Sequence, residues 1–455
     1  MNTYTFFMAI TLALAAASIG NAFAAQETTQ STAPDGAQKS LSTIYQLARD
    51  YDAKFAADQF GVAATNESGS LLGSALLPRI GLNGNYAYSY NKTEYSGAAS
   101  GNNIDDTYTS RGVAVSMKQA LLRFDSLYQY KRDSLYKDIA EIEQSIADQE
   151  LILRVANIYF LNLKEKENLE VAKARKSAFA ENLEKANISF QLGSYTITDK
   201  LEAQARYDLA NADAIEALNR LSAAQQELLL LIGEIPELAP VGDNKSLPDL
   251  SPNNMNYWKE KALNNNLQLN LAAQYATFAD RDLSAQKAEY WPKVDLVGSV
   301  NYANSDLNDQ TRNEAVVSVQ FDMPLISGGN TLSGVRKSKA MRQKAKNEHL
   351  LAERLALLNT QTSFLNVVNG YSMNQALSQA LKSSESAVKA TEKGLEVGVR
   401  TNLDLLNAQQ QYFETKRDYI HLRYDYLYAW LNLKAVSGTL TTEDVDTINK
   451  LLAAR

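Results

Sequence analysis

The chain has 455 residues, a formal net charge of −7, sparse Gly (21) and Pro (8), and no Cys. Zero Cys excludes disulfides, thiolate metal sites and Cys nucleophiles, and the lack of a concentrated basic segment argues against a nucleic-acid partner. Because the two histidines, His349 and His421, lie far apart, the sequence predicts no metal site, no histidine-based catalysis and no cofactor. The low Gly and Pro content favours long helices.

Residues 1–24 have the features of a secretory signal peptide. An apolar core, Phe6–Ala17, is followed by Ala22-Phe23-Ala24, an A-x-A-type cleavage site. No Lys or Arg precedes the core, so only the α-amino group supplies the positive charge usual there. The alternative, a membrane anchor, is disfavoured because the apolar segment is too short to span a bilayer well. Residues 25–39 are predicted to form a flexible N-terminus.

The first of two predicted repeats covers residues 40–232. A helix over 40–73 is followed by two segments, about 79–90 and 107–117, in which apolar and small polar residues alternate with the period of a β-strand. Residues 113–192 contain no Gly or Pro and carry apolar residues in the 4-3 spacing of a coiled-coil seam. The seam positions are Leu135, Ile139, Ile142, Ile146, Gln149, Leu153, Ala156, Phe160 and Leu163. A long helical hairpin is therefore expected to complete this repeat.

The same order of elements returns over residues 254–438, after a proline-rich linker at 233–253. The predicted elements are a helix, two strands and a second long helical hairpin: 254–286, about 293–304 and 315–323, and 331–437. An offset of 214 carries Pro78, Gly84 and Tyr88 onto Pro292, Gly298 and Tyr302. A repeat this long indicates a duplication. The remaining residues, 439–455, are expected to add a short C-terminal helix.

Each repeat contains a turn between its long helices, and an offset of 205 superimposes the two turns. The matched residues, first copy then second, are Gly193 and Gly398, Thr196 and Thr401, and Asp199 and Asp404. Thr as the N-cap residue, with Asp three residues later, stabilises the first turn of a helix. The sequence therefore predicts two helix–turn–helix hairpins of the same construction.

Each predicted strand is about ten residues long, the length that crosses a bilayer at a tilt, and its alternation is typical of membrane barrel strands. Four strands cannot close, and open edges in lipid leave backbone groups unpaired, so the chain must assemble with copies of itself. Two copies would supply eight strands, a barrel filled by its own side chains, and three would supply twelve, with room for a channel. A helix of ~70 residues is about 105 Å long at ~1.5 Å per residue. The helices are therefore expected to extend deep into the periplasm.

The sequence resembles the TolC-type outer membrane efflux and type I secretion channels over nearly all of the mature chain. The most specific matches are six short segments: Ser194–Asp199, Gln204–Asp208, Phe321–Gly329, Val397–Thr401, Asp404–Leu406 and Ser437–Leu440. It implies a mainly α fold with membrane β: a homotrimer whose 12-stranded β-barrel, with four strands per chain, continues as a long α-helical coiled-coil tunnel. It also implies an outer membrane exit duct, closed at its periplasmic tip, which a periplasmic adaptor and an inner-membrane pump of the ABC, RND or MFS type engage.

The resemblance also assigns a gate at the tip, formed by Thr198, Asp199, Arg400 and Leu395. Arg400 is present in the second copy only, where the first has Tyr195, and a cation just before a helix N-terminus is unfavourable for the helix dipole. A residue that costs local stability in one copy suggests a partner elsewhere, and the resemblance points to Asp199. The alternatives are that Asp199 serves only as a cap and that Arg400 is merely solvated. Leu395 replaces a tyrosine of the family, which predicts a looser closure.

Further sites follow from the same resemblance. Asp404 corresponds to a pore-facing aspartate whose three copies would favour cations at the constriction, and Asn407 replaces a second aspartate, which predicts weaker cation selectivity. The turns that an adaptor hairpin would dock onto comprise Leu192, Gly193, Ser194, Val397, Gly398 and Val399.

The strands carry aromatic residues expected to form a girdle at the membrane interface: Tyr86, Tyr88, Tyr90, Trp291 and Tyr302. The alternative, an aromatic site for a sugar or another ligand, is less favoured. For the whole chain, the competing hypothesis is a periplasmic coiled-coil scaffold without channel activity, which the four equivalently placed strands argue against. An enzyme is not expected, because the sequence shows no nucleophile–base pair, phosphate-binding loop or metal cluster.

Overall fold

A computed structural model describes residues 38–94, 104–241, 247–307 and 309–451. The predicted signal peptide and nearly all of the predicted flexible N-terminus lie outside these residues. From Lys39 onward the described residues belong to one unit. Among the described residues, no helix is both long enough and apolar enough to cross a membrane.

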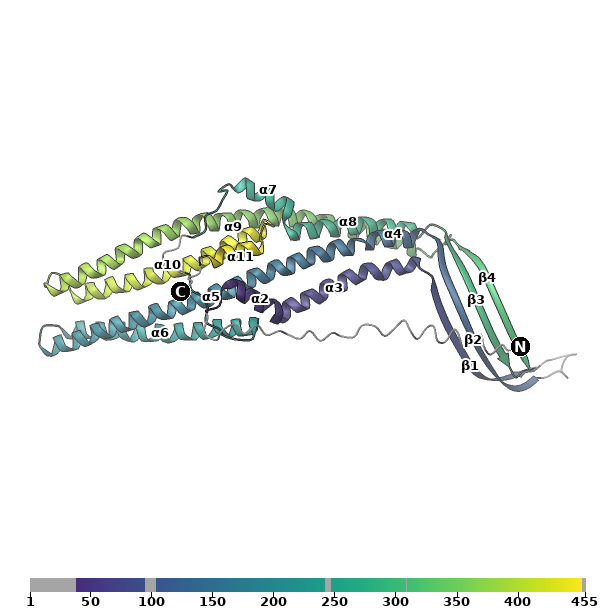
Figure 1. Ribbon diagram of the computed structural model, residues 1–455, viewed down its shortest axis with the longest axis horizontal. Coiled ribbons are helices and arrows are strands. Elements are labelled where there is room, and N and C mark those ends of the chain that lie inside the picture. The colour runs from purple at the N-terminus through teal and green to yellow at the C-terminus, as the bar shows by residue number, and fades with distance from the viewer. Residues whose placement is uncertain (1–37, 95–103, 242–246, 308, 452–455) are drawn as a thin grey trace. The chain divides into compact units, whose positions relative to one another are not determined.

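The four strands form a single antiparallel sheet in the order β1-β2-β3-β4 (Figure 1). Their bounds are Arg79–Thr93 (β1), Ile104–Arg123 (β2), Lys293–Ser305 (β3) and Gln310–Asp322 (β4). The repeats meet in the middle of the sheet, where Val113 of β2 pairs with Tyr302 of β3. Both strands of the first repeat are longer than expected, because β1 and β2 continue their pairing to Thr93 and Ile104. The remainder of the predicted polar loop, 95–103, lies outside the described residues.

The two faces of the sheet differ in polarity. In the observed register one face carries mostly aliphatic and aromatic side chains, among them Ile80, Leu82, Tyr86, Val113, Val115, Val300, Tyr302, Val317, Val319 and Phe321. The other carries small and polar residues such as Asn83, Asn85, Ser110, Gly112, Ala114, Ser116, Ser299, Asn301 and Ser318. The outer strands β1 and β4 have no second partner strand in the described chain. Within the described chain, one apolar face of the sheet and the outer edges of β1 and β4 are therefore left without a packing partner.

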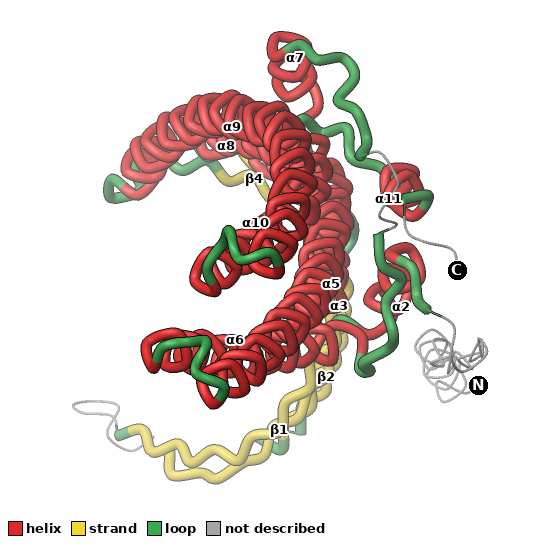
Figure 2. The backbone as a smooth tube through the Cα atoms, turned by 90° about the vertical axis from the view of Figure 1, so that its left-hand side faces the viewer, coloured by secondary structure: helices red, strands yellow, loops and turns green. Residues whose placement is uncertain are grey.

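The helices of the first repeat are α2 (Leu41–Tyr51), α3 (Ala53–Gly73), α4 (Phe124–Asp133), α5 (Leu135–Gln191) and α6 (Ile197–Ile232), with a short 3-10 turn at Ser74–Leu76. Those of the second are α7 (Met255–Asn265), α8 (Leu267–Ala288), α9 (Asn330–Glu396), α10 (Asn402–Val436) and the C-terminal α11 (Thr442–Asn449). Figure 2 shows α9, α10, α5 and α6 side by side, with both hairpin turns facing the viewer.

Two helices expected to be continuous are each divided in two. The break in 40–73 falls at Asp52, whose carboxylate accepts hydrogen bonds from the backbone N–H of Lys54 (3.2 Å) and Phe55 (3.3 Å). The break in 254–286 falls at Asn266, whose side chain accepts from Leu269 N–H at 2.9 Å. Asp and Asn favour such caps over helix interiors. The offset of 214 places Asp52 on Asn266, so the duplication retained this break.

The long Gly- and Pro-free segment is also divided, since its start belongs to β2 and a break at Ser134 separates α4 from α5. Its expected seam is only partly buried in its middle: Ile146, Gln149 and Leu153 line a groove of about 450 Å³ between α5, α8 and α9. The main core lies further along, where Tyr159, Phe160 and Leu163 of α5 pack with residues of α10 that include Tyr424, Leu427 and Leu431. The C-terminal end of the seam joins this core and Leu153 packs against it, whereas Leu135 and Ile139 are buried outside it.

A heptad of small residues lets α6 approach α5 closely. Ala203, Ala210, Ala217 and Ala224 recur every seven residues and are all buried. Without long side chains between them, two helices can pack at the short end of the usual interaxial range. Near the hairpin turn, Leu406 of α10 inserts among these alanines and Phe179 of α5. The second hairpin is thereby seated on the first close to both turns.

Candidate functional site

The two hairpin turns have the same backbone hydrogen bonds. In the first, the N–H groups of residues 192, 193, 194 and 195 donate to the carbonyls of 188, 190, 189 and 189. In the second turn, each donor and each acceptor lies 205 residues later: the donors are the N–H groups of residues 397 to 400, and the acceptors are carbonyls of residues 393 to 395. Gly193 and Gly398 have φ values of 76° and 79°, in the left-handed region that favours glycine at helix C-termini. The offset found in the sequence is therefore a geometric repeat.

A capping box begins the second helix of each hairpin. The Thr196 hydroxyl accepts from Asp199 N–H at 3.2 Å, and Thr196 N–H donates to the Asp199 carboxylate at 3.0 Å. The corresponding distances for Thr401 and Asp404 are 3.1 Å and 2.9 Å. The cap predicted for both aspartates is present, and it orders the first turns of α6 and α10.

The capping hydrogen bonds lower the pKa of Asp404. The backbone N–H of Thr401 contributes most, its hydroxyl comes next, and the positive charge of Arg400 adds to the effect. Each of these stabilises the charged form of the carboxylate. Asp404 is therefore ionised at neutral pH, as a cation-attracting position requires.

Arg400 does not meet Asp199 within the chain. Its guanidinium forms no ion pair with any described residue, and its side chain packs back over Gly394, where an added Cβ would lie 2.6 Å from Arg400 Cγ. Thr198 is exposed and Leu395 is half-buried. One chain thus places the four predicted gate residues on two adjacent hairpins without joining Arg400 to Asp199.

The predicted docking residues form the exposed ends of both hairpins. The side chains of Leu192, Val397 and Val399 are 78%, 73% and 75% exposed. The Ser194 hydroxyl donates to the carbonyl of Ser189 at 3.0 Å, which holds it against its own turn. Large apolar side chains this exposed at the ends of rigid turns suit contact with a partner.

Sequence reasoning missed a set of polar contacts between the hairpins. Arg206 of α6 donates from Nη1 to Gln410 Oε1 at 2.6 Å and from Nη2 to Asn407 Oδ1 at 3.1 Å. Beside it, buried Asn182 of α5 donates to Gln409 of α10 at 2.6 Å. Comparison of the two repeats could have drawn attention to Arg206, as it does to Arg400. Arg206 occurs in the first copy only, since the residue 205 positions later is Gln411.

The predicted girdle residues lie on the apolar face of the sheet or at its base. Tyr86, Tyr88 and Tyr90 follow one another along β1 and are well exposed. Tyr302 lies on the same face of β3. Trp291, just before β3, packs edge-on against Phe124 with ring centroids 4.6 Å apart. The tyrosines thus occupy one end of the apolar face, and the tryptophan lies where strands meet helices.

A second cluster that sequence reasoning missed joins strands to helices on the polar face of the sheet. Buried Asp295 of β3 accepts from Arg123 of β2 at 2.7 and 2.6 Å and pairs with Lys118 at 3.0 Å. Lys293 pairs with Asp125 of α4 at 2.9 Å. Bidentate pairing of this kind fixes geometry as well as adding attraction. The cluster holds β2 and β3 in register at the point where β2 becomes α4.

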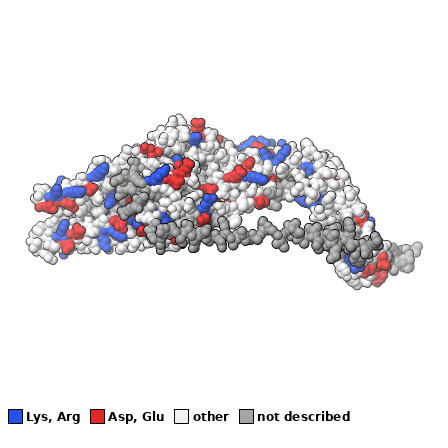
Figure 3. Space-filling model, viewed as in Figure 1, with Lys and Arg blue, Asp and Glu red and all other residues white. Residues whose placement is uncertain are grey.

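No group of three or more metal-ligating side chains is present among the described residues. On the face drawn in Figure 3, acidic and basic side chains are mixed over the helices, with no field of a single sign. The features that stand out are accordingly the two hairpin turns, the contacts between them and the two-faced sheet.

Comparisons with known proteins give one consistent result. The family model described as "Outer membrane efflux protein" matches residues 44–234 and 258–439. The alkaline protease secretion protein AprF of Pseudomonas aeruginosa is 29% identical over 417 residues, which cover 89% of this chain and 85% of that protein. The outer membrane protein TolC of Vibrio cholerae is 29% identical over 420 residues, covering 90% and 93%.

Solved structures share the fold. The CmeC outer membrane channel of Campylobacter jejuni aligns with a TM-score of 0.77 at 14% identity, covering 91% of this chain and 90% of that one. The outer membrane protein VceC of Vibrio cholerae aligns with a TM-score of 0.74 at 16% identity. The alignment covers 88% of this chain and 96% of VceC. The likeness extends over both repeats.

Proposed function

The chain belongs to the outer membrane efflux protein family, and we propose that it acts as a homotrimer in a tripartite export system. It is an outer membrane channel that extends into the periplasm and serves efflux and type I secretion. The competing hypothesis of a periplasmic scaffold without channel activity is not favoured. A duct of this kind needs no catalytic residue, and we assign none.

The observation that carries this function is the direct continuation of the sheet into long helices. The 13 residues of β4 span about 43 Å at ~3.3 Å each, enough to cross a hydrocarbon core of about 30 Å at the usual tilt. The open edges of β1 and β4 require neighbours in lipid. Three copies of a four-stranded sheet supply twelve strands, which leaves room for a channel that eight would fill.

In this assembly the apolar face of the sheet meets lipid, and the tyrosines of β1 and β3 form the interface girdle with Trp291. The 67 residues of α9 span about 100 Å at ~1.5 Å per residue. The hairpin turns therefore lie far from the membrane. Their exposed residues Leu192, Val397 and Val399, with the glycines and Ser194 between them, would receive the hairpin of a periplasmic adaptor.

We assign the gate to a contact between chains. The Arg400 guanidinium is exposed and without an ion pair in the described chain, and Asp199 uses one carboxylate oxygen for its cap. In a ring of three chains, Arg400 of one chain reaches Asp199 and Thr198 of the next. Leu395 adds no hydroxyl to this contact. Three copies of ionised Asp404, in the first turn of α10, would form the constriction, with Asn407 beyond it.

The relatives bear on cargo and partners. Two of them are named as secretion proteins for proteases, AprF of Pseudomonas aeruginosa and PrtF of Dickeya chrysanthemi. This supports an inner-membrane pump of the ABC type with a protein cargo, and RND or MFS pumps remain as alternatives for small-molecule efflux. Deletion of the gene, followed by profiles of secreted proteins and of drug susceptibility, distinguishes the two classes of cargo.

The channel itself is tested with purified protein. Outer-membrane extracts should contain a heat-resistant trimer, and this trimer should form ion-conducting channels in planar bilayers. Recovery of a monomer from the soluble periplasmic fraction, with no conductance after reconstitution, would contradict the channel function and favour the scaffold hypothesis.

A further inference from the structure

Arg206 of α6 connects the two hairpins through several hydrogen bonds. Its Nε donates to Glu202 Oε1 at 3.1 Å within α6, while its two terminal nitrogens donate to Gln410 and Asn407 of α10. The side chain is only 23% exposed. All three donor nitrogens of one guanidinium are therefore engaged, two of them across the hairpin interface.

The position of Arg206 follows the duplication. Glu202 and Asn407 are equivalent residues of the two repeats, since the offset of 205 carries one onto the other. Arg206 lies between them and binds both. The equivalent of Arg206 in the second copy, Gln411, instead donates within α10 to Thr415. This is a contact that the second repeat does not duplicate.

The surroundings make the contact rigid. The buried hydrogen bond between Asn182 and Gln409 lies beside it, and Leu406 packs with Phe179, Ala203 and Ala210 in the small core near the turns. Gln409 and Gln410 follow Asp404 by about one and a half helical turns. Movement of the start of α10 away from the first hairpin must therefore break both the bonds of Arg206 from α6 and the buried amide pair from α5.

We propose that Arg206 is a positioning residue that latches the two hairpins of one chain together and sets the ion selectivity of the tip. This rests on the proposed channel and deepens it. The latch acts within a chain, whereas the proposed contact of Arg400 acts between chains. By binding Asn407, Arg206 also places a positive charge one helical turn from Asp404, partly balanced by Glu202.

The latch predicts that the effect of charge at residue 407 depends on residue 206. In the parent, an aspartate introduced by Asn407→Asp would pair with the Arg206 guanidinium, because a carboxylate is a stronger acceptor than an amide. That pairing would tighten closure and cancel the new charge. With Arg206→Gln, the same aspartate would be unpaired and would add to the negative ring of Asp404.

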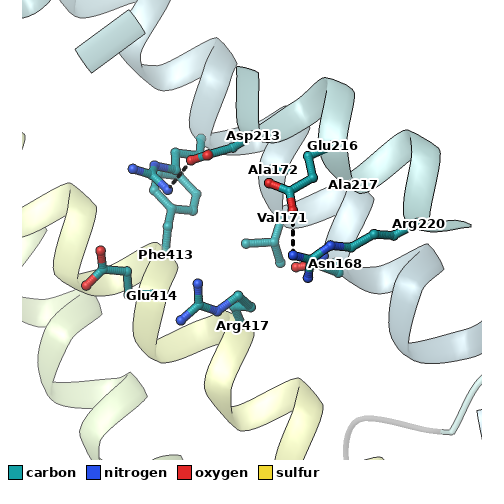
Figure 4. A pocket seen from close by; sticks show the side chains of 11 residues that line it. Asn168, Val171, Ala172, Asp213, Glu216, Ala217, Arg220, Phe413, Glu414 and Arg417 are labelled. Atoms are coloured by element: carbon teal, nitrogen blue, oxygen red, sulfur yellow. Dashed lines mark hydrogen bonds and ion pairs between the residues drawn. The ribbon is translucent and has the colours of Figure 1, made fainter. Parts of the chain in front are cut away.

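Arg220 provides a matched control on the same helix. It lies 14 residues, or two heptads, after Arg206 and pairs with Glu216 four residues before it, as Arg206 pairs with Glu202. Figure 4 shows this pair at the edge of a small pocket that Phe413 and Arg417 of α10 also line. No hydrogen bond joins Arg220 to α10 among the described residues. Arg220→Gln therefore removes the same local ion pair without touching the latch.

The experiment measures single-channel conductance and reversal potential in a KCl gradient across planar bilayers, for the full-length protein and variants of equal trimer content. Arg206→Gln should raise conductance at least about twofold, and Arg220→Gln should leave it at the parent value. Arg206→Lys, which keeps the charge but not the forked geometry, should raise conductance while retaining the parent's selectivity. Asn407→Asp should increase cation selectivity only together with Arg206→Gln.

The latch is overturned if Arg206→Gln conducts like Arg220→Gln. It is equally overturned if Asn407→Asp raises cation selectivity as much in the parent as in Arg206→Gln, because residue 407 would then be free of Arg206. A parent protein that forms no channel overturns the proposed function itself. That outcome is distinguishable from failure of the latch, in which channels form and the variants do not differ from the control.

Discussion

The turn between α5 and α6 and the turn between α9 and α10 share every backbone hydrogen bond and the Thr–Asp capping box, but differ in the residue before the cap. Tyr195 packs against the small core of its own hairpin, whereas Arg400 extends over Gly394 and forms no ion pair within the described chain. Both turns need the same backbone, and only one presents a cation to its neighbours. The duplication kept what the fold requires and diverged at the residue for which we propose a contact between chains.

The largest effect on stability should come from substitution of the glycine in each turn, Gly193 or Gly398. Gly193→Val and Gly398→Val each force a β-branched residue into the left-handed region, which costs about 1–3 kcal/mol. Since the φ values differ by only 3°, the two variants should lower the melting temperature of the trimer, measured by circular dichroism, to a similar extent. Gly61→Ala, at an open helical position, is the control. A large loss for one turn alone would break the equivalence of the two copies.

Substitution of Arg400 should affect conductance, whereas substitution of Tyr195, its equivalent in the first copy, should not. Arg400→Ser removes the cation that we place against Asp199 of the next chain, so single-channel conductance should rise severalfold. Tyr195→Ser alters the equivalent residue of the first copy and should leave conductance near the parent value. Equal conductance in the two variants would show that the difference between the turns has no role in gating.

Loss of the N-cap threonine should destabilise α6 and α10 to a similar extent. Thr196→Ala and Thr401→Ala each remove one side-chain acceptor at an N-cap, worth about 1 kcal/mol, and leave the Asp side chain with the backbone N–H as its remaining partner in the cap. Amide hydrogen exchange over the first turns of α6 and α10 should increase by a similar factor in each variant. Protection lost in only one hairpin would indicate that its cap is stabilised by something besides Thr.

The smallest effect concerns Asp404 and its pKa. Because the folded-state pKa lies below the ordinary value of 3.8, the charged cap is fully present above that value and is lost as the pH falls through the lowered pKa. Channel block by a multivalent cation should therefore be unchanged between pH 7 and pH 5, and should be lost only below pH 3.8, as the pH falls through the lowered pKa. Asp404→Ala should reduce block at pH 7, while Asp199→Ala should not. Undiminished block in Asp404→Ala would remove Asp404 from the constriction.

Much of this architecture could be predicted from sequence because its signals are local or periodic. The period of two in the strands, the Gly of each turn and the Thr-x-x-Asp caps each depend on a few neighbouring residues. The breaks at Asp52 and Asn266 were also local and equivalent at the offset of 214, but helix-forming neighbours masked them. An alignment of the two repeats at these positions would have found them.

The contacts between hairpins could not be predicted in the same way. Arg206 and Asn407 are separated by 201 residues, and Asn182 and Gln409 by 227. Which faces of α6 and α10 meet depends on the packing of Leu406 among the alanines of α6, a tertiary effect without a local pattern. From the sequence alone, Asn407 stands out only as the replacement of an acidic residue, whereas in the structure its amide oxygen accepts a hydrogen bond from Arg206 of the first hairpin.

The central claim is that the gate is a contact between chains at the diverged turn. Because the protein contains no Cys, Asp199→Cys and Arg400→Cys can be combined in one chain without background thiols. Under oxidising conditions the double variant should yield covalent dimers and trimers on a non-reducing gel, and its conductance should fall until a reductant restores it. A protein that remains monomeric on that gel, with conductance indifferent to reductant, would contradict the claim.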